Sequence, residues 1–181
     1  MACDISAGRS EGCKTGIGGI DIVYFANYVA DLQDAVTYDV TNTDLITDVN
    51  NITNLYKFSL KGNNSFTQKI VSSRENGTTY VEQTLTIDLK GLDVATTKQI
   101  KLLAYGRPII TVKRRDGQYL LMGLQHGADL TEASIESGTA QADFNGYKLT
   151  FVAMEKIPAN HLNCTSESTL ATLFSGATIV S

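Results

Sequence analysis

Hydrophobic and polar positions alternate along several short runs of the chain, and this pattern predicts a fold rich in strands. The clearest run is 78–89, where Val81, Leu85, Ile87 and Leu89 fall on one face of an extended strand. Further strands are predicted at 20–26, 55–60, 65–73, 109–114, 119–123 and 147–155. The run 20–26 is apolar enough to be buried on both faces at its end.

The other face of the run 78–89 is polar and rich in threonine, and Gln83 is the one polar exception among its apolar positions. The residues of the polar face are Tyr80, Glu82, Thr84, Thr86 and Asp88. A sheet that is polar on one side faces either solvent or a water-filled channel. The pattern alone leaves both possibilities open.

One helix and two tight turns are predicted within this series of strands. Asp93 is a suitable N-cap for a helix at about 93–105, and Pro108 prevents its continuation. The apolar stripe expected on this helix consists of Ile100, Leu103 and Ala104. Asn76-Gly77 and Asp116-Gly117 predict hairpin turns. Near the C-terminus we expect a short helix within 166–174, then a short edge strand or a disordered end at 177–180.

We therefore expect a mainly β protein with one flanking helix, organised around a single antiparallel domain at 20–160. Residues 1–19 are small, polar and rich in glycine, which predicts an N-terminal arm without a core of its own. An acidic extension is expected at 29–54, where apolar residues are sparse. Residues 161–181 are expected to form a C-terminal tail.

Composition narrows the class of protein. The chain has 181 residues, a net charge of −4 and 43% hydrophobic residues, which is typical of a soluble globular protein. No apolar run approaches the roughly 18 residues that span a bilayer, and the first residues lack the apolar segment of a signal peptide. Cys3, Cys13 and Cys164 are odd in number, which favours reduced thiols in a cytosolic fold; a bridge between Cys3 and Cys13 is the alternative.

Charge is unevenly distributed along the chain. Residues 19–50 hold six carboxylates and no Lys or Arg, whereas 94–125 hold six basic residues against Asp116 alone. Such segregation is found on solvated faces, and also on self-complementary surfaces of an assembly. The candidates for contacts between subunits are Asp31, Asp34, Asp44, Asp48, Lys113, Arg114 and Arg115. Phosphate binding by 113–115, with Tyr105 or Tyr119 stacking on bases, is a weaker alternative because the overall acidity opposes it.

The residues that carry out catalysis or bind metals are sparse. His126 lies in a turn-like Gln-His-Gly context, and His161 with Cys164 forms one His-x-x-Cys pair, which is too little for a zinc site. The glycines at 16–19 precede a strand, and this excludes a dinucleotide-binding loop. We therefore predict no catalytic residues, no metal and no cofactor, and hence no enzyme. An enzyme or a sugar-binding domain would need a pocket of converging polar groups that this sequence does not predict.

The region 65–160 resembles the major tail tube proteins of tailed bacteriophages. The resemblance rests on the series Asn76–Thr86, Lys101–Arg107, Asp116–Gly123, Asp143–Phe151 and Glu155–Ala159. It covers about half of the chain, and its motifs are structural patterns rather than a catalytic signature. The N-terminal third has no counterpart in it.

The resemblance implies an antiparallel β-sandwich or half-barrel that assembles as probably hexameric rings, stacked into a hollow virion tail tube. The polar face of 78–89 would then line the lumen, where double-stranded DNA passes without specific binding. Residues 1–19 and 29–54 would contact adjacent rings.

The family resemblance also implies partners and a location. The expected partners are further copies of the chain, a tape measure protein, a baseplate or terminator protein and, in a contractile tail, a sheath; no membrane is expected. Assembly would take place in the cytoplasm of the bacterial host. The alternative function is another virion structural protein: a head decoration, a head–tail connector or a tail terminator.

Overall fold

Strands dominate the computed structural model, which describes residues 7–14 and 16–181. Strands hold 44% of the described residues and helices 13%, which confirms the predicted mainly β fold, but two α-helices are present where one flanking helix was predicted. The strands are β1 (Ile20–Ala26), β2 (Val36–Tyr38), β3 (Leu45–Val49), β4 (Asn54–Ser59), β5 (Ser65–Ser73), β6 (Thr78–Lys90), β7 (Ile109–Arg114), β8 (Tyr119–Met122), β9 (Asp129–Glu136), β10 (Gly146–Glu155), β11 (Asn160–Leu162) and β12 (Thr178–Val180). The helices are α1 (Val94–Tyr105), α2 (Glu167–Leu173) and a short 3-10 helix, η1 (Leu32–Ala35).

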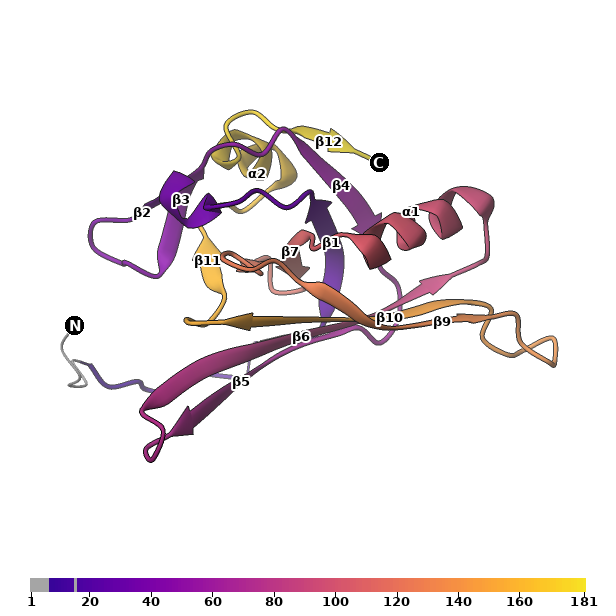
Figure 1. The fold of residues 1–181 in the computed structure, drawn as a ribbon, viewed down its shortest axis with the longest axis horizontal. Coiled ribbons are helices and arrows are strands. Elements are labelled where there is room, and N and C mark those ends of the chain that lie inside the picture. Colours follow the sequence, from indigo (N-terminus) through magenta and orange to yellow (C-terminus); the bar gives the residue numbers. More distant parts are fainter. Residues whose placement is uncertain (1–6, 15) are drawn as a thin grey trace.

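The strands form two sheets that lie one above the other (Figure 1). The lower sheet has four strands in the order β5-β6-β10-β9, all antiparallel to their neighbours. The upper sheet has eight strands in the order β12-β4-β1-β7-β8-β11-β3-β2, with two parallel pairs, β12 with β4 and β11 with β3. α2 covers the upper sheet on the side away from the lower one (Figure 1).

The upper sheet has a hydrophobic core on each of its faces. β1 shows this directly, since Val23 and Phe25 belong to the core between the two sheets, while Tyr24 and Ala26 belong to the core beneath α2. All four are buried, which confirms the prediction that β1 is buried on both faces. The core between the sheets also holds Leu85 and Ile87 of β6.

Most strands from the sequence pattern lie where they were expected. The β5–β6 hairpin turns through 74–77, and Gly77 has the positive φ (62°) that a tight turn requires. The β7–β8 hairpin turns through 115–118, and Gly117 has a φ of 87°. β9 lies within 124–146, where no strand was predicted.

α1 begins and ends as predicted but packs loosely. The Asp93 carboxylate accepts a hydrogen bond from the backbone N–H of Thr96 at 2.7 Å, as an N-cap does. Of the expected apolar stripe, Ile100 is buried and Leu103 is half-buried, but Ala104 is exposed. The buried stripe is therefore narrower than predicted; α1 lies beside β1 and above β9 and β10 of the lower sheet (Figure 1).

The segments 29–54 and 161–181 are integral to the upper layer. Leu32, Ile46, Val49 and Ile52 are buried beneath α2, together with three residues of the C-terminal segment, Leu170, Leu173 and Phe174. The description of 161–181 as a tail is therefore corrected: it supplies β11, α2 and the edge strand β12. The short helix within 166–174 and the strand within 177–180 are confirmed.

Residues 7–14 and 16–19 of the predicted arm are exposed and form no helix or strand. The proposed Cys3–Cys13 bridge involves a residue outside the described part of the chain. Within the described part, no helix combines the length and the apolar character that crossing a membrane requires.

Candidate assembly site

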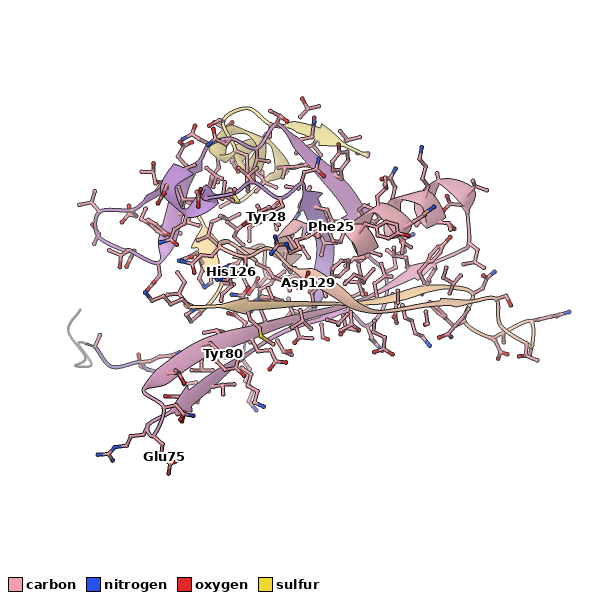
Figure 2. The ribbon with its side chains drawn as sticks, viewed as in Figure 1. Phe25, Tyr28, Glu75, Tyr80, His126 and Asp129 are labelled. Carbon is pink, nitrogen blue, oxygen red and sulfur yellow. The ribbon has the colours of Figure 1, made fainter. Side chains whose placement is uncertain are left out.

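The polar positions of β6 form the outward face of the lower sheet. Val81, Gln83, Leu85 and Ile87 are buried, whereas the alternate residues between them are partly exposed. The outward side chains are Tyr80, Glu82, Thr84, Thr86 and Asp88, as the alternation predicted. Figure 2 shows Tyr80 on the β5–β6 hairpin, whose tip carries Glu75. Whether this face lines a lumen stays a prediction.

Neighbouring strands extend this polar face across the sheet. Thr86 lies between Ser65 of β5 and Thr150 of β10, and Thr84 has Thr67 as its neighbour on β5. Threonine is favoured here because its β-branched side chain suits the pleated backbone while its hydroxyl stays hydrated. We call this outward face the wall; it is mostly polar, although Met154 is 59% exposed on it, and its residue Asp88 also lines a pocket of about 770 Å³ beside α1.

Carboxylates outnumber cations on the wall. The acidic side chains that pair into it are Glu82, Asp88, Asp129, Glu132 and Glu136, and the basic ones are Lys69, Lys90 and Lys148. Lys148 contacts Glu136 at 2.9 Å. This hydrogen bond from Lys148, with a second from Ser134, lowers the pKa of Glu136, so that carboxylate stays charged. The wall is therefore acidic at neutral pH.

Both edges of the lower sheet are unpaired within the described chain. β5 and β9 lie at its two ends, with nine and eight residues respectively. Ile70 of β5 is 64% exposed and Ile135 of β9 is 57% exposed. Long open edges with exposed apolar residues readily accept another strand, and proteins that stay monomeric generally protect such edges. These edges are the second component of the candidate site.

The acidic candidates for subunit contacts are dispersed over the upper layer. Asp31 and Asp34 lie at η1, and Asp44 lies in the β2–β3 loop; all three are exposed. Asp48 is half-buried on β3 and accepts a hydrogen bond from Asn50. The structure does not bring these four carboxylates into one cluster.

The basic candidates are largely engaged within the chain. Arg114 pairs with Asp116 at 2.8 Å. Arg115 contacts Asp21 at 3.3 Å and donates to the Gly62 carbonyl at 3.0 Å. Lys113 lies 5.7 Å from the ring centre of Tyr119. A role of this run between subunits stays a prediction, but its charges already have partners.

Two buried polar side chains, Gln83 and Glu155, connect the sheets, and only Gln83 stands out in the sequence pattern. Gln83 accepts from the Gly123 N–H at 3.2 Å, and its amide donates to the Ile157 carbonyl at 3.3 Å. Glu155 is 3% exposed and accepts from the N–H groups of Gln125 and His126 at 3.1 and 3.0 Å. Burial raises the pKa of Glu155. Alternation along β10 places Glu155 on the same face as Phe151 and Ala153. This pattern in the sequence could have predicted that Glu155 is buried.

The chemical groups noted in the sequence remain apart. No cluster of three potential metal ligands occurs among residues 7–14 and 16–181. Cys164 is buried, and burial raises the pKa of its thiol to about 12, so the thiol is protonated at neutral pH. His126 and His161 are both exposed.

Neither a family model, nor a curated protein, nor a solved structure matches this chain.

Proposed function

We propose that this chain is a structural subunit that assembles into rings stacked as a tube, in the manner of a phage tail tube. The observation that carries the proposal is the lower sheet. One of its faces belongs to a hydrophobic core, the other is a polar acidic wall, and both edges are open. A sheet of this kind is suited to joining copies of itself side by side.

The strand directions support edge-to-edge joining. Directions alternate across β5-β6-β10-β9, so β5 and β9 run antiparallel to one another. In a ring with rotational symmetry, β9 of one copy then meets β5 of the next as an antiparallel pair. With six copies, strands about 4.8 Å apart and tilted by about 40° close into a barrel of roughly 48 Å backbone diameter.

The wall chemistry supports passage of DNA rather than binding. In such a barrel the acidic, threonine-rich face is on the inside, and the upper sheet with its helices forms the outer layer. Carboxylates repel a phosphate backbone, whereas proteins that bind DNA present Lys and Arg to it. The outer layer and the two ends of the tube are the surfaces for other tail proteins.

Electron microscopy of the purified protein across a concentration series tests the proposal. We expect hollow tubes or stacked rings whose inner wall has the diameter estimated above. If the subunit alone assembles slowly, purified tail-tip proteins are added as nuclei for assembly. Compact closed oligomers that never stack would instead support the head decoration, connector or terminator function. A protein that stays monomeric even with nuclei contradicts the proposal.

A further inference from the structure

An apolar knob projects from the β2–β3 loop. Val40 is 98% exposed, more than any other large hydrophobic side chain in the described part of the chain. Exposed single valines are common on flexible loops, but this one lies at the tip of an ordered turn. We call residues 39–44 the Val40 loop.

Hydrogen bonds fix the Val40 loop on both sides of the valine. The Asp39 carboxylate accepts from the N–H groups of Thr41 and Asn42 at 2.9 and 2.8 Å. The loop is closed by the Asp39 N–H donating to the Leu45 carbonyl at 2.8 Å, and by the Leu45 N–H donating to the Asn42 carbonyl at 2.9 Å. The valine is therefore held away from the protein with little entropy left to lose on binding.

A matching apolar groove lies between α1 and the strands β1 and β4. It has a volume of about 390 Å³, and its principal side chains are Phe25, Tyr28, Tyr56, Phe58, Leu103 and Arg107. Leu102, which also lines it, is 56% exposed. We call this groove the α1 groove. Figure 2 shows Phe25 and Tyr28 on the upper layer, where the C-terminal end of α1 approaches β1.

The two surfaces are complementary in charge. Asp39 and Asp44 flank Val40, and no Lys or Arg occurs anywhere from 19 to 50. Arg107 is the one charged residue that lines the α1 groove, where its guanidinium lies 5.0 Å from the ring centre of Tyr28. The adjoining pocket at the N-terminal end of α1 carries both signs of charge, with Lys57, Lys61 and Lys90 beside Asp88 and Asp93. The α1 groove holds Arg107 and no carboxylate, so its charge is opposite to that of the loop throughout.

We propose that the Val40 loop of one copy inserts into the α1 groove of a second copy. β2 and β3 lie at one end of the upper layer and α1 at the other, so the contact is between copies and joins them head to tail (Figure 1). The long direction of this contact follows the strands of the lower sheet, and it therefore links one ring to the next. This part of the inference rests on the proposed tube.

Cross-linking between two singly substituted chains tests the contact. Val40→Cys and Leu102→Cys are made in separate chains, in a background with serine at 3 and 13, and are then mixed under mild oxidation. We expect a disulfide-linked pair that contains one copy of each chain. The matched control replaces Leu102→Cys by Ser137→Cys, an exposed position in the loop between β9 and β10, and should give no specific product.

Substitutions give an independent readout. Val40→Asp and Arg107→Asp should each raise the concentration needed for assembly by roughly tenfold or more, as expected when one buried anchor of an interface is lost. Val94→Asp is the control, because Val94 is 89% exposed on α1 and lines neither groove. Circular dichroism confirms that each variant is folded.

The outcomes separate this inference from the proposed function. Tubes without the cross-link, and unchanged assembly of Val40→Asp, overturn the Val40 contact and leave the tube standing. A specific cross-link in short head-to-tail chains that never become hollow supports the contact and overturns the tube. No association of any kind overturns both.

Discussion

Glu155 shows how one side chain determines a connection between layers. Its Oε1 atom accepts hydrogen bonds from two backbone N–H groups of the turn that follows β8. Its Oε2 atom has no hydrogen-bond partner in the structure. A buried carboxylate in this position is costly in its charged form, because desolvation favours the protonated acid. The stability of the fold is therefore linked to pH through this residue.

Glu155→Gln should remove this pH dependence. Burial raises the folded-state pKa of Glu155 above its ordinary value of 4.5. A raised pKa means that the group's stabilisation is present below the unfolded-state pKa and is lost as pH rises through the folded-state pKa. We expect the unfolding free energy of the wild type to fall relative to the Gln variant as the pH rises above about 4.5. Urea titrations at a series of pH values measure the unfolding free energy of both proteins. If the two free energies changed with pH in parallel, Glu155 would not be the source of the pH dependence.

The absence of a side chain at Gly146 allows the start of β10 to pair closely with β6. A Cβ added there would lie 2.0 Å from the Leu89 carbonyl oxygen, so Gly146→Ala should separate the start of β10 from β6. We expect a loss of about 3 kcal/mol in unfolding free energy. Gly117→Ala is the control: it meets no atom within 4 Å, so only its positive φ costs energy, about 1 kcal/mol. Equal losses for both variants in urea titrations would refute the steric explanation.

At the scale of elements, the sequence pattern predicted those strands and helices whose signals are local. β1, the β5–β6 and β7–β8 hairpins and α1 each have clear alternation, a turn dipeptide or a cap. β9 was missed because its run Asp129–Glu136 is acidic, and only Leu130 and Ile135 offer strong apolar positions. β2, β3 and β11 are short strands stabilised by α2 and by pairings distant in sequence, which no local pattern records.

The same distinction applies to the candidate site. The outward face of β6 follows from alternation alone, so its five residues were found. The contacts of Arg115 with Asp21 and Gly62 depend on how distant segments meet in space, whereas Arg114 pairs with Asp116 within its own turn. Charge counts along the chain indicate where cations occur but not whether they already have partners.

The start of α1 depends on one hydroxyl group from the lower sheet. The Tyr147 hydroxyl donates to the Asp93 carbonyl at 2.9 Å, accepts from the Asp93 N–H at 3.1 Å and lies 2.6 Å from the Thr97 hydroxyl. Tyr147→Phe should therefore loosen the first turn of α1 and cost about 1–2 kcal/mol. Hydrogen exchange at 94–99 measures the loosening. Tyr105→Phe, on an exposed tyrosine of the same helix, is the control; matching exchange in both variants would exclude the anchoring role.

At the scale of the whole molecule, the two sheets differ in how much of their surface the fold buries. The upper sheet is buried on both faces and supplies most of the hydrophobic interior. The lower sheet gives one face to that interior and keeps its other face and both edges exposed. A chain arranged in this way presents the same wall and the same edges in every copy, which is what a repeating assembly requires.

Reversing the charge of the wall should change how an assembled tube treats DNA. Replacing Glu82 and Asp88 with Lys leaves the core untouched, since both residues lie on the outward face. We expect tubes of this variant to retain double-stranded DNA at low salt and to release it as salt rises. Co-sedimentation at increasing salt measures retention. Lys at Ser168 and Thr172, two exposed positions of α2, is the control for basic charge on the outer layer. Equal retention by the two variants would show that the wall is not the inner surface.

The position of α2 in the upper core has a consequence for synthesis on the ribosome. Leu32, Ile46 and Val49 are translated long before Leu170, Leu173 and Phe174, the side chains that cover them. Because chains are synthesised from the N-terminus at about 5–20 residues per second, several seconds pass between the synthesis of these early core residues and the synthesis of α2. This core can therefore close only after α2 has left the ribosome, and its apolar residues stay exposed until then.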